Sequence, residues 1–397
     1  MRLSKMSEGI TKSPTFAVEA KATAMRAQGV HVIPFGAGEP DFDTPEHIRD
    51  AAKASIDAGH TRYTATAGIV ELRQAIANSV QARLGLTFKP NNVIVSCGAK
   101  HSLLNAFLAL VGPGDEVIVP APYWVSYPDQ VRVAGATPVV IDTASTGFKL
   151  TASALEAAVT PNTRVIILNS PSNPTGATYT RDELRAIAEV AVKHDMVVVS
   201  DEIYDRLLYT GEEAVSIAML GDAIRERTLI VNGVSKTYAM TGWRIGWAVG
   251  NAELVDAMNR IQGHSTSNPC SVSQRAALAA LTGPDEPVQA MIDAFRDRGR
   301  RMAERLCSLP HVSCAVPTGA FYCFPNVAPY IGIEFEGRHI ASSFDLADLI
   351  LEQAHVAVVA GGAFGCDNFI RLSYATSIAQ IEDGMDRIER LFAKMIK

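Results

Sequence analysis

Hydrophobic and polar positions follow one repeated plan along most of the chain. Short β-branched runs are followed by turns rich in Gly, Pro, Ser or Asn, and then by helical patterns. Five such units begin at NVIVSCGAKHSLL, DEVIVPAPYW, RVIILNSPSNPTG, DMVVVSDEIYDRLLY and TLIVNGVSKTYAMTGWRIGWAVG. Runs that are apolar throughout are typical of strands covered on both faces. Strands alternating with helices predict an α/β fold with a mostly parallel, doubly wound sheet.

The sequence also predicts where two helices begin and that the C-terminal part has a different architecture. The segments TRDE (180–183) and SALE (153–156) each place a hydroxyl three residues before a glutamate, which predicts two capping boxes. Nearer the C-terminus, the charged amphipathic stretch DAFRDRGRRMAERLCSL precedes the short strand-like pieces GAFYCFPN, HVAVVAGGAF and NFIRLSYATS and a final helix. This order predicts a smaller α+β unit that is joined through a long helix.

Composition narrows the class of protein. A chain of 397 residues is long enough for two to three folding units. Hydrophobic residues make up 48% and charged residues 20%, which excludes a disordered chain. The 36 basic and 42 acidic side chains give a net charge of −6. That balance argues against nucleic-acid or anionic-membrane partners, which require a basic face.

Several other signals are negative. No run approaches the ~18 apolar residues of a membrane span, and the N-terminus lacks the pattern of a secretory signal. We therefore expect a cytoplasmic protein. The six cysteines form no CxxC pair, so we expect reduced, buried thiols. The nine histidines show no HxxxH or HExxH spacing, so we expect no metal site.

Candidate chemistry lies where the strands end, because open α/β sheets bind ligands at the carboxyl ends of their strands. GAGEPD (36–41) breaks the GxGxxG pattern and no GxxxxGK[ST] occurs, which disfavours a Rossmann dehydrogenase or a P-loop enzyme. The polar residues at or near the strand ends are Gly98, Ala99, Lys100, Tyr123, Trp124, Asn173, Asp201, Tyr204, Ser235 and Lys236.

Together these residue types fit one cofactor. A desolvated lysine such as Lys236 can form a Schiff base. A carboxylate at a neighbouring strand end, Asp201, can pair with a pyridinium nitrogen. Small residues that open the helix in GAKHSLLNAF offer backbone N–H groups to a phosphate. Trp124 can stack on a ring, and Tyr204 or Asn173 can hydrogen-bond a phenolate oxygen. The set matches pyridoxal 5'-phosphate.

The sequence resembles the class I aminotransferases that depend on pyridoxal phosphate. SPSNPTG, SDEIY, SKTYAMTGWRIGW and RLSYATS are similar to signatures of that family, and the resemblance runs essentially end to end from GAGEPDFDTP. GAKH, PAPYWVSYP and HSTSNP bring the chain closest to the bacterial aspartate aminotransferase branch. The resemblance implies a large cofactor-binding domain over 45–290 and a small domain built from 1–44 and 291–397.

The resemblance also implies roles for residues around the cofactor. Lys236 would form the Schiff base and move the substrate proton, and Asp201 would hold the pyridine nitrogen. Tyr204 and Asn173 would contact the phenolic oxygen, and Trp124 would stack on the ring. The implied phosphate contacts are Gly98, Ala99, Lys100 through its backbone, Ser235 and Arg244.

For the substrate, the resemblance implies that Arg371 clamps the α-carboxylate, with Gly38 as a backbone contact and with Trp124 and Asn173 alongside. Tyr63 would reach the phosphate in a neighbouring subunit, which implies a homodimer with shared active sites. Lys100 would hold a distal carboxylate. The implied reaction is ping-pong transamination from L-aspartate to 2-oxoglutarate.

Other functions remain open at this point. Relatives active on prephenate tend to carry a basic residue near the N-terminus, where this chain has Thr11 followed by Lys12. Aromatic or other amino-acid aminotransferases, C–S lyases and an ACC-synthase-like eliminase use the same apparatus. A cofactor-binding regulator is disfavoured, because the 35 residues before GAGEPDFDTP are too few for a helix-turn-helix.

Overall fold

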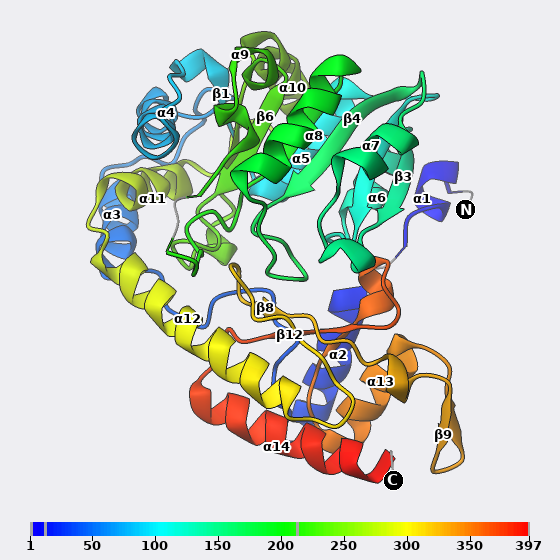
Figure 1. Ribbon diagram of the computed structural model, residues 1–397. Coiled ribbons are helices and arrows are strands. Elements are labelled where there is room, and N and C mark those ends of the chain that lie inside the picture. Colours follow the sequence, from blue (N-terminus) through cyan, green and yellow to red (C-terminus); the bar gives the residue numbers. More distant parts are fainter. Residues whose placement is uncertain (1–2, 12–13, 212–213, 396–397) are drawn as a thin grey trace.

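A seven-stranded sheet organises the larger part of the computed structural model, which describes residues 3–11, 14–211 and 214–395 (Figure 1). The strand order is β1-β7-β6-β5-β4-β2-β3. The strands are β1 (Val93–Ser96), β2 (Glu116–Ala121), β3 (Thr137–Asp142), β4 (Thr163–Asn169), β5 (Val197–Asp201), β6 (Thr228–Gly233) and β7 (Gly246–Val249). Among the described strands of this sheet, the pairings of β7 with β1 and β6 are antiparallel and the other four are parallel, so the predicted mostly parallel sheet is confirmed.

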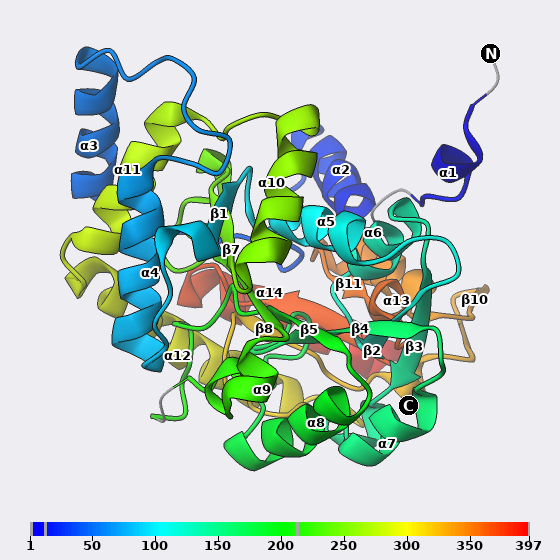
Figure 2. The ribbon, with the colours of Figure 1, turned by 90° about the horizontal axis from the view of Figure 1, so that it is seen from above.

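Helices cover both faces of this sheet, as Figure 2 shows from above. Successive residues of β2 illustrate the arrangement: Val117 and Val119 pack toward α5 (Ala99–Leu110), α6 (Tyr127–Val133) and α10 (Ala252–Ser265). Ile118 packs on the other face, toward α7 (Ala152–Ala158) and α8 (Arg181–Lys193). Burial on both faces explains the continuous apolar runs within the central strands, such as 165–168 of β4 and 197–199 of β5.

One strand was missing from the five predicted units. β3 lies at the edge of the sheet and pairs only with β2. Its side chains are half-buried or exposed, so the segment TPVVID lacks the continuous apolar run of the central strands. A strand with one open edge and a partly solvated face does not need such a run.

The two predicted capping boxes have different outcomes. The box at α8 is confirmed, because the Thr180 hydroxyl accepts from the Glu183 N–H and the Glu183 carboxylate accepts from the Thr180 N–H. The box at Ser153 is wrong. The N-cap of α7 is Thr151, whose backbone is extended (φ −95°, ψ 153°) and whose hydroxyl accepts from the Ala154 N–H. Ser153 already lies within the first turn.

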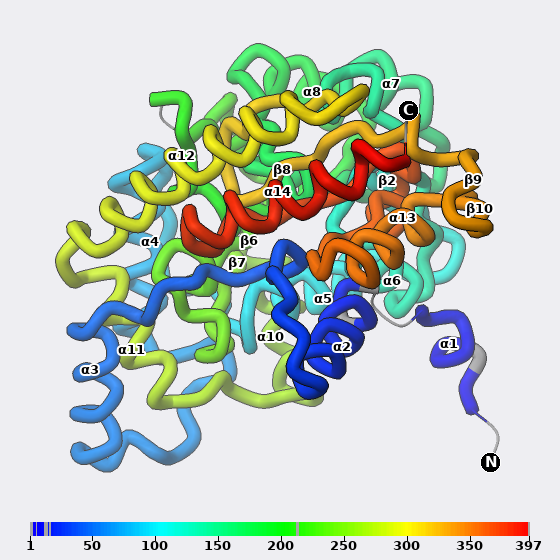
Figure 3. The backbone as a smooth tube through the Cα atoms, turned by 90° about the horizontal axis from the view of Figure 1, so that it is seen from below, coloured from blue at the N-terminus to red at the C-terminus, as the bar shows by residue number. Residues whose placement is uncertain are grey.

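The C-terminal part forms a smaller α+β unit, as predicted. The long helix α12 (Glu286–Cys307) leads to a three-stranded sheet of order β11-β12-β8. Its strands β8 (Tyr322–Cys323), β11 (Val359–Ala360) and β12 (Ile370–Ser373) fall in the three strand-like pieces of the sequence. α14 (Ile378–Met395) runs beside α12 (Figure 3), where Arg305 pairs with Glu382, Asp386 and Glu389.

The N-terminal helix joins this C-terminal unit. Ala22 of α2 (Pro14–Ala27) packs with Val32, Leu351 and Ala357, and Ile33 forms a parallel bridge with Val356. The remaining named elements are α1 (Lys5–Glu8), α3 (Glu46–Asp57), α4 (Val70–Leu84), α9 (Asp222–Arg225), α11 (Ser271–Thr282), α13 (Ser343–Leu349), β9 (Ile333–Phe335) and β10 (Arg338–Ile340).

Two negative signals of the sequence can be compared with the structure. Within the described ranges, no helix combines the length and the apolar character that crossing a membrane requires. The expectation that the cysteines are buried holds only for Cys323 and Cys366. It is wrong for Cys270 and Cys307, which are exposed. Both lie at helix termini, Cys270 before α11 and Cys307 at the end of α12, where their side chains are in contact with solvent.

The corrected cap yields a stability prediction. Thr151→Ala removes the hydroxyl that satisfies the Ala154 N–H, so the free energy of unfolding should fall by about 1 kcal/mol. Ser153→Ala, the matched control in the same turn, should change it by less than about 0.5 kcal/mol. Urea denaturation measures both values, and a larger loss from the Ser153 variant would contradict the assignment.

Candidate active site

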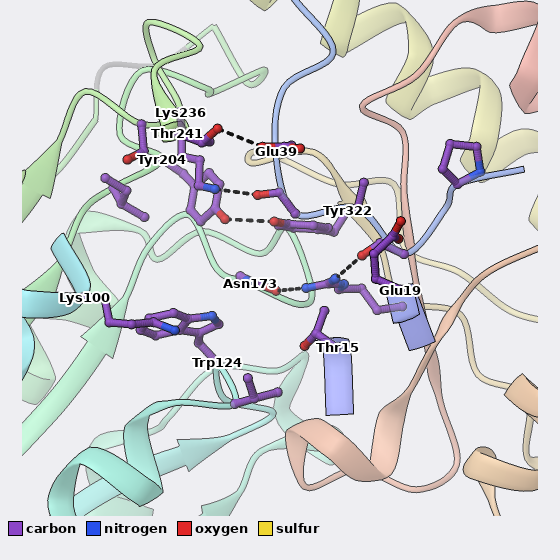
Figure 4. Close-up of a pocket in the computed structure, with 18 of the residues that line it drawn as sticks. Thr15, Glu19, Glu39, Lys100, Trp124, Asn173, Tyr204, Lys236, Thr241 and Tyr322 are labelled. Carbon is purple, nitrogen blue, oxygen red and sulfur yellow. Dashed lines mark hydrogen bonds between the residues drawn. The ribbon is translucent and has the colours of Figure 1, made fainter. Parts of the chain in front are cut away.

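A cavity of about 1050 Å³ lies between the large sheet and the C-terminal unit, and Figure 4 shows its lining. The carboxyl ends of β4, β5 and β6 supply one wall, and β8, β12 and the segment before α3 supply the other. The structure brings these predicted residues together in the lining: Gly38, Ala99, Lys100, Trp124, Asn173, Asp201, Tyr204, Ser235, Lys236, Arg244 and Arg371.

Two predicted site residues are placed differently. Gly98 is not part of the lining, but it immediately precedes Ala99, which is. Tyr63 does not line the cavity of this chain, and its side chain is 92% exposed.

Lys236 lies deep in the cavity, in the loop that follows β6. Its Nζ donates to the Gly38 carbonyl oxygen at 2.5 Å (Figure 4). Desolvation lowers the pKa of this amine to about 8, and Glu39 and Asp201 only partly oppose the effect. An amine with this pKa is neutral in a useful fraction of molecules near neutral pH, which is the form that acts as a nucleophile or base.

Asp201 is the last residue of β5 and is 4% exposed. Its Oδ2 accepts from the Tyr127 hydroxyl at 2.7 Å, and its Oδ1 accepts from the Ile203 N–H at 3.2 Å. Burial raises the pKa of the carboxyl to about 6, while these donors and the nearby Lys236 favour the charged form. A cationic ring nitrogen beside Asp201 would compensate for its burial.

Tyr127 was missed by the sequence analysis, although it lies in the motif PAPYWVSYP. The side chain is buried, and its hydroxyl is the side-chain donor that faces Asp201. The two residues are 74 positions apart, so their contact arises only when α6 packs beside the end of β5. The only sequence feature that could have pointed to Tyr127 is its place in PAPYWVSYP, the motif that also contains Trp124.

The turn before α5 forms an anion-binding geometry. Gly98 has φ +87°, and a Cβ there would lie 2.5 Å from Nη2 of Arg244. A Cβ on Gly246 would lie 2.1 Å from the backbone nitrogen of Ala99. In the described part of the chain, no side chain caps the start of α5. The helix N–H groups and the Arg244 guanidinium thus converge on one point, which suits a phosphate.

Arg371 is a second anion-binding group and is 2% exposed. Its Nη1 donates to Asn173 Oδ1 at 3.0 Å and its Nη2 donates to the Gly36 carbonyl at 2.9 Å. Its Nε has no partner among the described residues, and no described carboxylate forms an ion pair with it. Burial lowers the pKa of this guanidinium. Nη1 and Nη2 each carry a second N–H, so this buried cation in the cavity lining is suited to a carboxylate ligand.

Aromatic rings and one further cation complete the wall. The Lys100 ammonium lies 4.8 Å from the centroid of the Trp124 ring and remains open to solvent at the mouth. Partial desolvation and the nearby Arg244 lower the pKa of Lys100. The hydroxyls of Tyr204 and Tyr322 are 2.9 Å apart (Figure 4). Tyr322 is another residue that the sequence analysis did not select.

The N-terminal segment approaches the mouth of the cavity. Thr11 donates to Asp129 of α6 at 3.0 Å, and Thr15, Glu19 and Arg26 line the cavity. Lys12, the basic residue considered in connection with prephenate, lies outside the described residues.

Comparisons with known proteins agree with this geometry. The chain is 45% identical to the aspartate aminotransferase of Bacillus subtilis, over 99% of this chain and 100% of that protein. It is also 45% identical to an aspartate/prephenate aminotransferase of Nitrosomonas europaea, with the same two shares covered. The solved aspartate aminotransferase of Rhizobium meliloti superposes with a TM-score of 0.96 at 42% identity, over 100% of both chains.

A second solved structure and a family match extend these findings. An aspartate aminotransferase of Thermus thermophilus with maleate superposes with a TM-score of 0.92 at 42% identity, over 98% of this chain and 100% of that one. The sequence model of the family "Aminotransferase class I and II" matches residues 30–388. With the matching fold and cavity, these findings show that the chain belongs to the class I and II aminotransferases and is a transaminase.

Proposed function

We propose that the protein is an aspartate aminotransferase that uses pyridoxal 5'-phosphate. It converts L-aspartate and 2-oxoglutarate to oxaloacetate and L-glutamate by a ping-pong reaction. One observation carries the proposal: Lys236, Asp201 and Arg371 line the same cavity. Lys236 has a lowered pKa, Asp201 is a buried carboxylate, and Arg371 is a buried cation with no carboxylate partner among the described residues. The names of the relatives supply the choice of aspartate.

The residues present fit the cofactor. Asp201 would hold the pyridine nitrogen, and the Trp124 ring would cover one face. Tyr204 and Asn173 would contact the phenolic oxygen. The phosphate would be held by Gly98, Ala99, the Lys100 backbone, Ser235 and Arg244. The uncapped start of α5 and the buried Asp201 are the features that need such a ligand. When bound, the cofactor supplies an aldehyde and an electron-withdrawing ring that stabilises negative charge on the substrate.

The chain itself then binds the substrate and moves a proton. Arg371 would donate to the α-carboxylate through the second N–H groups of Nη1 and Nη2, which Asn173 and Gly36 do not use, and its bond to Asn173 fixes the guanidinium plane. Gly38, which lines the same cavity, would be a backbone contact to the same carboxylate. Lys236, as a neutral amine, would move a proton between the substrate Cα and the aldehyde carbon of the cofactor, in opposite directions in the two half-reactions.

Lys100 gives the site its preference for acidic substrates in this proposal. Its ammonium lies over the Trp124 ring (Figure 4), whereas Arg371 lies beside Asn173 and Tyr322. Two cations at separate points of one cavity match the two carboxylates of aspartate, glutamate and their 2-oxo acids. A neutral side chain gains nothing from the second cation.

The assembly is also part of the proposal. Tyr63 would reach the phosphate site of a second copy, so the protein would be a cytoplasmic homodimer with shared active sites. The exposed side chains of Tyr63, Ile56 and Val70 support this arrangement, because an interface would cover them. Each copy would have a large domain over 45–290 and a small domain built from 1–44 and 291–397.

Prephenate is a second candidate substrate. One relative is named an aspartate/prephenate aminotransferase, and the cavity extends past Lys100 to Thr15 and Arg26 of α2. A panel of amino donors, each read by the absorbance change of the bound cofactor, distinguishes aspartate, prephenate and aromatic donors.

Loss of the lysine amine should abolish the reaction. Lys236→Ala should lower turnover by about 10³-fold or more and remove the visible band of the covalently held cofactor. Lys193→Ala, an exposed control on α8, should leave both unchanged. Rapid transamination by the Lys236 variant would contradict the proposal.

The lowered pKa of Lys236 predicts a pH dependence in protein freed of cofactor. With a pKa of about 8, about a tenth of the amine is neutral at pH 7, against roughly 0.03% for an ordinary lysine. Covalent attachment of added pyridoxal phosphate should therefore speed up as pH rises and level off above about pH 8. Stopped-flow absorbance measures the rate, and a rise that continues to about pH 10 would show an unperturbed amine.

Lys100→Met should separate the roles of the two cations. It should raise the KM for aspartate by roughly 10-fold or more, because a charge-assisted hydrogen bond is lost, and change that for alanine by less than about 2-fold. Lys53→Met, at an exposed position, is the control. Equal losses for both donors would remove Lys100 from substrate selection.

A further inference from the structure

Tyr322 lies where the cofactor side and the substrate side of the cavity meet (Figure 4). It belongs to β8, is fully buried at 0% exposure, and still borders the cavity. No role was assigned to it above. Its position differs from that of an ordinary core tyrosine, because both its hydroxyl and its ring face groups that the proposed reaction uses.

The hydroxyl of Tyr322 faces Tyr204. The two oxygens are 2.9 Å apart, and the rings meet edge to face at 5.9 Å between centroids. A hydroxyl carries one proton and can donate only once. If Tyr204 donates to the phenolic oxygen of the cofactor, it cannot also donate to Tyr322. Tyr322 must then be the donor of this pair, and its bond fixes the Tyr204 proton in the direction of the cofactor.

The ring of Tyr322 faces the substrate cation. The Arg371 guanidinium lies 4.5 Å from the Tyr322 centroid and 5.1 Å from the Phe364 centroid. The backbones are neighbours too, since β8 pairs with β12 and Tyr322 is opposite Ser373. Aromatic faces stabilise a guanidinium without neutralising it. They leave Arg371 available for a carboxylate, whereas an acidic neighbour would compete for it.

The surroundings of Tyr322 leave few other interactions. The charged or titratable groups that act on its hydroxyl are Arg371 and Tyr204, and those that act on Tyr204 are Tyr322, Arg371 and Asp201. The hydroxyl also lies beneath the Gly38 turn, where an added Cβ would sit 3.6 Å from it. That turn holds the Lys236 amine.

We propose that Tyr322 is a positioning residue for transamination, with two separable functions. Its hydroxyl directs the proton of Tyr204 toward the cofactor, and its ring holds the Arg371 guanidinium in the plane that receives the substrate carboxylate. The inference rests on the proposed function, because it assumes that Tyr204 contacts the cofactor and that Arg371 binds the substrate.

Two substitutions separate the functions. Tyr322→Phe removes the hydroxyl and keeps the ring, so Tyr204 loses an incoming hydrogen bond and becomes a weaker donor. An anionic phenolic oxygen is then less stabilised, and the pH midpoint of the cofactor absorbance band should rise by about 0.5 to 1 unit. The dissociation constant of maleate, an unreactive dicarboxylate, should stay within about 2-fold, because Arg371 keeps its aromatic neighbour.

Tyr322→Met also removes the ring but fills much of its volume. Maleate affinity should then fall by roughly 10-fold, since the guanidinium loses one aromatic face. Tyr322→Leu serves as a second non-aromatic variant should the methionine variant fail to fold. Calorimetric titration of the cofactor-loaded protein with maleate measures the affinity, and pH titration of absorbance measures the midpoint.

Tyr330→Phe is the matched control. Tyr330 is also 0% exposed, but its hydroxyl donates to the Pro310 carbonyl at 2.7 Å and its ring stacks on Phe392. This variant should change neither the midpoint nor the maleate affinity. In a Tyr204→Phe background, adding Tyr322→Phe should shift the midpoint no further, because the hydroxyl acts only through Tyr204.

The outcomes distinguish this inference from the proposed function. If the unmodified protein binds pyridoxal phosphate without an aspartate-dependent absorbance change, the proposed function fails. If the unmodified protein does respond to aspartate and Tyr322→Phe behaves like Tyr330→Phe, the hydroxyl function is overturned. If both non-aromatic variants bind maleate as tightly as the unmodified protein does, the ring function is overturned.

Discussion

Arg371 is a cation enclosed by protein, and the described groups that bond to it or stack on it are neutral. An amide oxygen, a backbone carbonyl and two aromatic faces surround it in place of a carboxylate. Removing a charge from water in this way is costly unless a partner compensates. Several dipoles share the charge and lower this cost, and the proposed anionic ligand would offset the rest. The surrounding groups thus hold the guanidinium in place without supplying a negative charge to pair with it.

The wall formed by the large sheet also contains groups that have no partner of opposite charge among the described residues. The start of α5 is left uncapped, and Arg244 is brought against it because Gly98 and Gly246 have no side chains. Asp201 is the complementary case, a buried carboxylate whose pKa burial raises. Each of these groups is less stable alone than it would be with a bound partner of opposite charge. A protein with a net charge of −6 thus gathers Lys100, Arg244 and Arg371 in the lining of one cavity, as the proposed anionic ligands would require.

How much of the structure can be predicted from the sequence depends on how far apart in the chain the interacting residues lie. Central strands such as β4 and β5 were predicted because burial on both faces leaves a continuous apolar run. The edge strand β3 was missed because it has no such run, and the cap at Ser153 was misplaced by two residues because local spacing does not fix the backbone angles. Lys236, Asp201 and Arg371 were found through family motifs, and their chemical roles stay predictions. Tyr322 was missed because its partner Tyr204 is 118 positions away.

The contacts of Arg371 also have a consequence for folding. Its guanidinium joins Asn173, 198 residues away, and Gly36, 335 residues away. Contacts between such distant positions close large loops and form late, after local helices and neighbouring strands have appeared. The surroundings of Arg371 are therefore assembled from the beginning, middle and end of the chain at once. Secondary structure can return during refolding well before a competent site exists, so regained activity is the stricter measure of the native state.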